Sequence, residues 1–181
     1  SEMCIRDRCI LADKEEIGSV GISGMQSHYF EHFMEGLCDA QGVKLSDCFA
    51  NSFCLSADVS NAFDPNWPET CDKRNNSQLN YGVAICKYTG SRGKGGASDA
   101  SAEAMGHVRS TLDKAGVIWQ IATLGKVDQG GGGTVAAYMA NRNIVTVDAG
   151  VPVLSMHAPL ELVSKLDCYE TMLACKAIYL A

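Results

Sequence analysis

The sequence contains no apolar run that approaches the roughly 20 residues needed to cross a bilayer, and it shows no recognisable secretory signal. It also lacks an excess of basic residues, because 15 lysines and arginines against 21 aspartates and glutamates give a net charge of −6. These absences argue against a membrane or a nucleic acid as partner. What is present is the composition of a globular domain, 46% hydrophobic and 20% charged over 181 residues. We therefore expect one domain with a sizeable core, in the cytoplasm.

Cysteine is abundant, with nine residues, but no C-x-x-C pair occurs. The count is odd, and a chain of this length does not need disulfides to be stable. We expect reduced, mostly buried thiols, and no structural zinc held by cysteine.

The first eight residues, SEMCIRDR, fit neither the strand predicted after them nor a known kind of leader. The string resembles the translation of a sequencing adapter. We interpret residues 1–8 as a non-native leader and residues 9–181 as a fragment that lacks its N-terminal part.

Short apolar runs alternate with helical patterns along the chain, which predicts an α/β fold with a largely parallel sheet covered on both faces. Strands are predicted at 9–12, 52–58, 82–88, 117–122, 143–150 and 152–157, and helices at 24–42, 97–116, 134–142 and 165–180. A long loop is predicted at 61–82 and glycine loops at 89–96 and 125–133. We expect Ser98 or Asp99 to cap the helix at 97–116.

Three of the predicted strands end at polar residues: Glu15 and Glu16 follow the first, Asp58 closes the second, and His157 closes the last. Each has a simple structural interpretation, as a solvated loop pair, a turn residue and a core histidine. Ligands of parallel α/β sheets lie at the carboxyl ends of the strands. Three polar endings in one domain therefore favour a shared site.

Carboxylates and imidazole are the ligand set of a hydrolytic zinc site. Adjacent residues on an extended backbone point in opposite directions, so Glu15 and Glu16 are expected to have different tasks. One would bind metal, and the other would take the proton of a water whose pKa the metal lowers to about 7.

Five segments in this order resemble the motifs of the aspartyl aminopeptidase and vacuolar aminopeptidase I family: DKEEIGSVG, SADVSNAFDPN, KYTGSRGKGGASDASAE, GKVDQGGGGT and VPVLSMHAPLELVSKLDCYET. Members are dinuclear zinc exopeptidases of the three-layer phosphorylase/hydrolase-like α/β fold. The resemblance extends from about Cys9 to the C-terminus. It implies removal of the N-terminal residue of peptide substrates, two Zn²⁺ ions (with other divalent metals as an alternative) and a large homo-oligomer.

The resemblance also assigns roles. Glu15 corresponds to the general base, Glu16 and His157 to ligands of one zinc, and Asp58 to a ligand of the second, with a metal-bound hydroxide as the attacking group. An upstream H-x-D histidine and a bridging aspartate of the family are absent from this chain. We therefore expect the fragment alone to be inactive.

Two further residues correspond to positions near the substrate. Lys87 is placed to meet a substrate carboxylate, or else is a solvated lysine at a strand end. Asn61 stands where some relatives have a histidine, which puts a strict preference for acidic N-terminal residues in doubt.

Several other groups are given structural interpretations. His28 and His32 have the spacing of a helical zinc pair without the H-E-x-x-H motif, so we expect a surface helix face. Asp128, Asp148 and Glu161 are given structural, supporting or capping roles. Two other functions stay open: a related di-zinc amidohydrolase, and a non-catalytic assembly subunit of the same fold.

Overall fold

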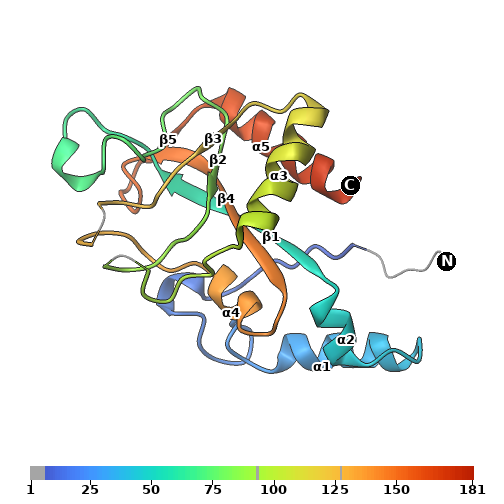
Figure 1. The fold of residues 1–181 in the computed structure, drawn as a ribbon. Helices are drawn as coiled ribbons and strands as arrows, with labels where there is room; N and C mark the ends of the chain where they lie inside the picture. The colour runs from blue at the N-terminus through green and yellow to red at the C-terminus, as the bar shows by residue number, and fades with distance from the viewer. Residues whose placement is uncertain (1–6, 93, 127) are drawn as a thin grey trace. The chain divides into compact units, whose positions relative to one another are not determined.

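The computed structural model describes residues 7–92, 94–126 and 128–181, and the chain divides into two compact units, Ser1–Leu45 and Ser46–Ala181. The first unit contains the short 3-10 helix η1 (Glu15–Ile17) and the helix α1 (Tyr29–Asp39) (Figure 1). The helix predicted at 24–42 is confirmed in its central part, where Met34 and Cys38 are buried one turn apart. Most of the predicted leader, residues 1–6, lies outside the described residues.

The strand predicted at 9–12 is wrong, because these residues are exposed and form no strand. Close to this segment the described part of the unit has only an isolated bridge between Asp13 and Gly24. Without a ladder of paired residues beside it, an apolar run has neither backbone partners nor a face to pack on.

The second unit alternates strands and helices, which confirms the α/β prediction. Its elements are α2 (Leu45–Ala50), which begins at the unit boundary, β1 (Phe53–Asn61), η2 (Pro68–Thr70), β2 (Val83–Cys86), α3 (Ala102–Ala115), β3 (Trp119–Ile121), α4 (Ala136–Ala140), β4 (Val145–Leu154), β5 (Leu162–Val163) and α5 (Lys165–Tyr179).

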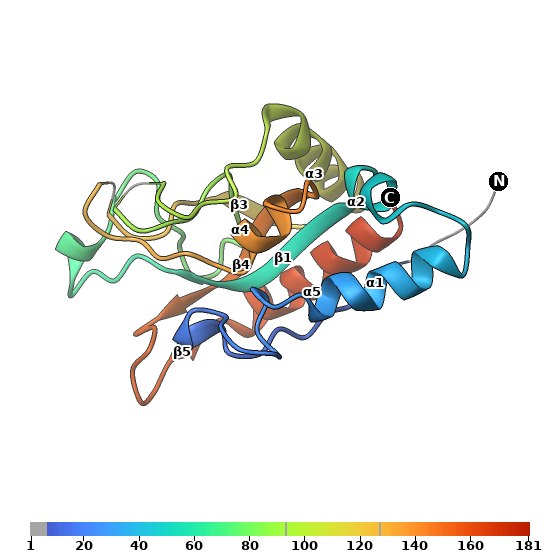
Figure 2. The ribbon, with the colours of Figure 1, turned by 90° about the horizontal axis from the view of Figure 1, so that it is seen from below.

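The strands form one mixed sheet in the order β1-β4-β2-β3, with β5 also paired to β4. The longest ladder is parallel and joins β1 to β4, from Phe53 opposite Val145 to Asn61 opposite Val153. Strands β2 and β3 are also parallel, whereas β4 is antiparallel to β2 and to β5. Figure 2 shows β1 running alongside β4. The sheet is therefore mostly, but not purely, parallel.

Strand β4 has different surroundings on its two faces. Val147 and Ala149 join Ile85 of β2 in a core that includes Val108 and Leu112 of α3 and extends to α5. Because side chains alternate along a strand, Asp148 points to the opposite face, where Thr134, just before α4, donates a hydrogen bond to it. Helices therefore cover both faces, and the second face is polar at its centre.

Helix α3 begins later than the sequence pattern predicted. Its cap is Ser101, whose hydroxyl accepts a hydrogen bond from the backbone N–H of Ala104 at 3.1 Å. The prediction of Ser98 or Asp99 as the cap is wrong, since Ser98 donates instead to Asp148. The helix ends at Gly116, with φ +69.

Two predicted strand limits also need correction. Strand β1 continues three residues beyond Asp58 to Asn61, so Asp58 lies within the strand. The strands predicted at 143–150 and 152–157 are one strand, β4, which passes through Pro152 and ends before His157. Pro152 lies between the ladder of β2, which reaches Gly150, and that of β5, which starts at Val153, so one edge of β4 is open there and tolerates a residue without an N–H.

Helix α5 is tied to the turn that precedes β2. The carboxylate of Asp167, which is 1% exposed, accepts hydrogen bonds from the backbone N–H groups of Asn80 at 2.8 Å and Gly82 at 2.9 Å. Ser164, which caps α5, donates to the side chain of Asn80 at 2.6 Å. These polar contacts fix the start of β2 against the last helix.

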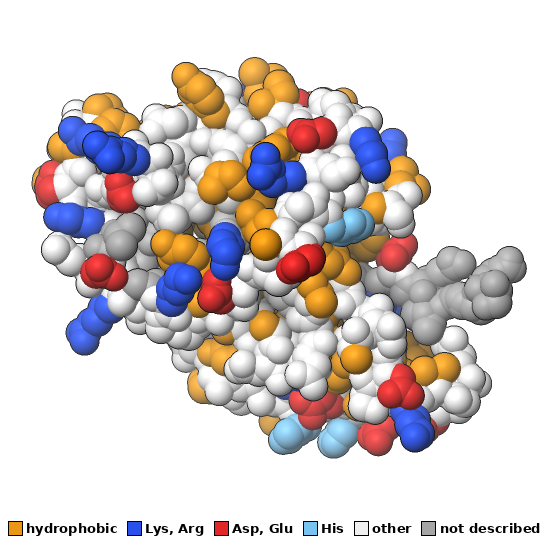
Figure 3. All heavy atoms as spheres, in the orientation of Figure 1, with side chains coloured by type: hydrophobic (Ala, Val, Ile, Leu, Met, Phe, Trp, Pro, Cys, Tyr) orange, Lys and Arg blue, Asp and Glu red, His pale blue; other side chains and the backbone are white. Residues whose placement is uncertain are grey.

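No helix within the described residues combines the length and the apolar character that a membrane span requires. Acidic and basic side chains are interspersed with apolar ones over the face drawn in Figure 3.

Candidate functional site

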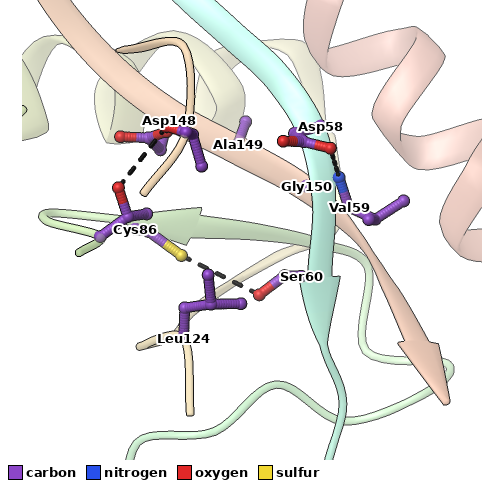
Figure 4. Close-up of a pocket in the computed structure, with 10 residues that line it drawn as sticks. Asp58, Val59, Ser60, Cys86, Leu124, Asp148, Ala149 and Gly150 are labelled. Carbon is purple, nitrogen blue, oxygen red and sulfur yellow. Dashed lines mark hydrogen bonds between the residues drawn. The ribbon is translucent and has the colours of Figure 1, made fainter. Parts of the chain in front are cut away.

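A small pocket lies on the polar face of the sheet, within the second unit (Figure 4). Strands β1, β2 and β4 form its floor. The first glycine loop (residues 87–101, between β2 and α3) and the second glycine loop (residues 122–135, between β3 and α4) complete it. The lining residues are Asp58, Val59, Ser60, Cys86, Thr89, Leu124, Thr134, Asp148, Ala149 and Gly150.

Asp148 is the buried acidic group of this pocket, with an exposed fraction of 3%. Its two carboxylate oxygens accept hydrogen bonds from the hydroxyls of Thr134 at 2.5 Å and Ser98 at 2.7 Å. Burial raises the pKa of Asp148, the two hydroxyls oppose that shift, and the negative charge of Asp58 adds to it. These contacts tie both hydroxyls to β4, and they are compatible with the structural or supporting role predicted for Asp148. The part played by Thr134 was missed, although its place directly after four glycines was visible.

The thiols beside Asp148 are kept neutral. Burial, with a contribution from the charge of Asp148, raises the pKa of Cys86 to about 12 and that of Cys54 to about 11. Figure 4 shows the sulfur of Cys86 facing the hydroxyl of Ser60, 4.0 Å away. The eight described cysteines are free thiols, but only three are buried, fewer than predicted; these three are Cys38, Cys71 and Cys86.

The two glycine loops are hydrogen-bonded to each other. The N–H of Gly90 donates to the carbonyl of Gly132 at 2.7 Å, and that of Arg92 donates to the carbonyl of Gly130 at 2.9 Å. At Gly131, with φ +91, a Cβ atom would lie 2.3 Å from the carbonyl oxygen of Gly90. The contact therefore requires glycine at position 131.

Asp58 lies on β1, opposite Gly150 of β4, and is one of the residues that line this pocket. It is exposed, and one oxygen accepts the backbone N–H of Val59 at 2.7 Å. Within the described part of the chain no cationic side chain forms an ion pair with it. Asp58 and Asp148 thus form an acidic pair on neighbouring strands, one exposed and one buried (Figure 4).

Lys87 follows β2 directly, but its ammonium is already engaged. It donates to Asp99 at 2.6 Å, and Lys94 lies 3.6 Å from the other oxygen of the same carboxylate. The hydrogen bond from Lys87 is the main cause of the lowered pKa of Asp99. Both partners of the Lys87–Asp99 pair are nearly half exposed, at 45% and 46%. This contact lies within the first glycine loop rather than on the pocket lining.

Asn61 ends β1 and is directed into the loop that follows. Its amide donates to the sulfur of Cys71 at 3.4 Å, and its carbonyl accepts hydrogen bonds from the side chains of Asn76 and Ser77. Asn61 therefore holds the loop 62–82, and it is not among the residues that line the pocket.

His157 lies three residues beyond β4 in a left-handed conformation, with φ +67. Its backbone N–H donates to the carboxylate of Glu161 at 2.5 Å. Such a conformation is uncommon for a residue with a side chain. The contact confirms the structural role predicted for Glu161.

Glu15 and Glu16 belong to the first unit. They begin η1, which is bounded by left-handed residues at Lys14 and Gly18. The assumption of an extended backbone is therefore wrong. In a 3-10 helix, successive side chains still differ in direction by about 120°, so the two carboxylates leave the turn along different directions.

The turn is closed by contacts from its own neighbourhood. The N–H of Ser19 donates to the carbonyl of Lys14 at 2.7 Å, and the side-chain amide of Gln26 donates to the carbonyl of Gly18 at 2.6 Å. His28 and His32 are exposed at the surface of this unit, as predicted. His28 also contacts the carboxylate of Glu31 at 2.6 Å.

A zinc ion fits these residues in part. Asp58 offers an exposed carboxylate without a cationic partner, which is a suitable donor for a hard or borderline divalent metal. Among the residues that the structure describes, however, no three side chains of His, Cys, Asp or Glu gather closely enough to hold a metal ion. The described residues thus provide donors but do not complete a site.

Solved structures place this fold among aminopeptidases. An M18-family aminopeptidase from Thermotoga maritima aligns with a TM-score of 0.87 and 43% identity, covering 92% of this chain and 38% of that one. Aminopeptidase I from Clostridium acetobutylicum aligns with a TM-score of 0.86 and 47% identity, covering 93% of this chain and 37% of that one. The predicted fold class is confirmed.

The sequence defines the family. Residues 3–179 match the family described as "Aminopeptidase I zinc metalloprotease (M18)", and the chain belongs to it. A probable M18 family aminopeptidase 1 from Clostridium acetobutylicum is 51% identical over 166 residues, which are 90% of this chain and 36% of that relative. The chain spans little more than a third of the length of the curated relatives it matches.

Proposed function

We propose that this chain supplies part of the catalytic centre of a zinc-dependent aminopeptidase that hydrolyses the N-terminal peptide bond of its substrates. The observation that carries the proposal is the pocket at Asp58, a carboxylate that forms no ion pair with the described residues and lies beside the buried Asp148. It occurs in a chain that matches a zinc metalloprotease family over nearly its whole length. In this proposal residues 9–181 are the C-terminal part of the catalytic domain.

The proposed division of work follows the chemistry of the side chains. Glu16 and His157 would hold one zinc ion, and Asp58 would hold the second. When bound, zinc would supply polarisation of the scissile carbonyl and activation of the attacking water. Glu15 receives the proton of that water and passes it to the leaving amine. The short turn η1 supports this division because it sends two adjacent carboxylates in different directions.

The surroundings of Lys87 bear on the proposed substrate preference. A substrate carboxylate that approaches Lys87 has to compete with Asp99, which already accepts a hydrogen bond from it at 2.6 Å. Asn61 is held by the loop 62–82, so a role in substrate contact requires that loop to take part. We therefore propose that the enzyme does not require an acidic N-terminal residue.

The family resemblance extends the proposal to the whole protein. We propose a cytoplasmic enzyme that works as a large homo-oligomer, with the remaining zinc ligands supplied outside this chain.

The proposal is tested by Glu15→Gln in the full-length protein. Because glutamine cannot accept a proton, kcat on a chromogenic aminoacyl substrate should fall at least about a hundredfold, while the measured zinc content stays unchanged. Glu35→Gln is the matched control, since Glu35 is an exposed glutamate on α1 of the same unit, and its kcat should be unaffected. Turnover of Glu15→Gln at the wild-type rate with full metal content would exclude Glu15 as the base.

A further inference from the structure

Asp148 is a buried carboxylate that the proposed reaction does not use. It is 3% exposed, and no basic side chain in the described part of the chain pairs with it. Its charge is met instead by two hydroxyls, Thr134 on one oxygen and Ser98 on the other. Two hydrogen bonds therefore converge on this carboxyl group.

The two hydroxyls come from different loops, so Asp148 links both loops to the same strand. Thr134 lies at the end of the second glycine loop, and Ser98 lies near the end of the first. Glycine-rich segments have few side chains with which to pack, so polar contacts decide where they lie. The carboxylate of Asp148, on β4 in the middle of the sheet, is the point at which both loops are tied to the same strand.

The loops also depend on each other. Gly90 and Arg92 of the first loop donate to carbonyls of the second, and the hydroxyls of Thr89 and Thr134 lie 3.5 Å apart. Figures 1 and 2 show both loops side by side at the end of the sheet where β1 ends. A substitution that removes the hydrogen bond between one loop and Asp148 should therefore also loosen the other loop.

We propose that Asp148 is a positioning residue for substrate binding, which holds both glycine loops against the sheet and so fixes the wall of the pocket beside Asp58. The wall consists of Thr89, Leu124 and Thr134 from the two loops. In this proposal the substrate lies against this wall. The inference rests on the proposed function for the identity of the substrate, but the holding of the loops does not depend on it.

Thr134→Val in the full-length protein tests the inference, because valine keeps the shape of threonine and removes the hydroxyl. Losing one hydrogen bond to the carboxylate should raise KM for a peptide substrate about tenfold, with kcat changed less than about threefold. Thr134→Ser restores the hydroxyl and should bring KM back near the wild-type value. A purely structural role would lower the fraction of active protein, and hence the apparent kcat, with KM unchanged.

Thr146→Val is the matched control. Thr146 is buried on the same strand, two residues from Asp148, but its hydroxyl donates to the carbonyl of Ile144 at 2.9 Å and forms no hydrogen bond with a described residue of either loop. Its removal should leave KM unchanged. Equal effects of Thr134→Val and Thr146→Val on KM would overturn the inference.

Amide hydrogen exchange supplies a readout that does not depend on activity. Thr134→Val should speed the exchange of the Gly90 and Arg92 amides, which lie in the other loop, whereas Thr146→Val should not. Unchanged exchange at both amides would also overturn the inference. If the wild-type protein hydrolyses no peptide, the proposed function fails, and the exchange measurement still decides whether Asp148 holds the loops.

Discussion

The turn that carries Glu15 and Glu16 and the wall of the pocket beside Asp58 are built in opposite ways. Two hydrogen bonds that close the turn, from Ser19 to Lys14 and from Gln26 to Gly18, span five and eight residues. The pocket wall is closed by contacts that span 14 residues, from Thr134 to Asp148, and 50 residues, from Ser98 to Asp148. These hydrogen bonds of the turn are therefore local, whereas the proposed substrate wall exists only when the sheet has formed.

Gly131→Ala should disturb the pocket wall most strongly, because Gly131 lies where the two glycine loops meet. A Cβ atom there would lie 2.3 Å from the carbonyl oxygen of Gly90, and the φ of +91 strains any residue with a side chain. We expect the free energy of unfolding of the chain, measured in urea, to fall by roughly 2–3 kcal/mol.

Gly106→Ala is the control for this substitution. Gly106 lies within α3, and its Cβ would meet nothing within 4 Å. Alanine there should stabilise the chain by roughly 0.5–1 kcal/mol. If both alanines had the same effect, the loop contact at Gly131 would have no energetic importance.

Gln26→Ala weakens the turn that carries Glu15 and Glu16, and it should lower the free energy of unfolding less than Gly131→Ala does. It removes the hydrogen bond at 2.6 Å to the carbonyl of Gly18, at a cost of about 1 kcal/mol. We expect faster amide exchange at Gly18 and Ser19, with the exchange of the glycine-loop amides unchanged. Gln41→Ala is the control, because that side chain makes only a long contact of 3.3 Å to Leu37. Changes that spread into the glycine loops would show that the turn is not built locally.

Cysteine labelling sharpens the comparison without changing the stability. Cys38 is buried in the first unit and Cys86 in the second, where its pKa is raised to about 12, so little reactive thiolate forms at pH 8. In native protein at pH 8, an alkylating reagent should modify the exposed Cys9 and Cys168 and leave Cys86 intact. With rising urea, Cys38 should become reactive before Cys86, because the first unit has the smaller core. Simultaneous labelling would mean that both units open together.

Sequence patterns predicted the positions of α1, α3, α4 and α5, because these helices have signals within their own length, but they missed the short helix α2. Helix α5 shows apolar spacing and a serine at its start, and α3 ends at a glycine. The α/β class followed from the alternation of elements. The family resemblance was also visible in the order of the motifs, and the family match confirms it.

The errors arise where a distant partner decides the local structure. Ser98 was predicted as a helix cap, but its hydroxyl donates a hydrogen bond to Asp148, 50 residues away. Two strands were predicted at 143–150 and 152–157, but the single strand β4 passes through Pro152 because one edge is open there. The carboxylate of Asp58 was placed at a strand end, although the strand continues to Asn61. The roles of Glu15, Glu16, Asp58 and His157 in catalysis and zinc binding stay predictions.

The contact between Asp167 and the turn before β2 has a consequence for the order of folding. Asp167 accepts hydrogen bonds from the backbone N–H groups of Asn80 and Gly82, which lie 87 and 85 residues earlier in the chain. Closing a loop of that length costs entropy before any contact is gained, so this step comes late. Until α5 docks, the start of β2 lacks acceptors for two N–H groups. During synthesis, therefore, this end of the sheet can be completed only after Asp167 has left the ribosome.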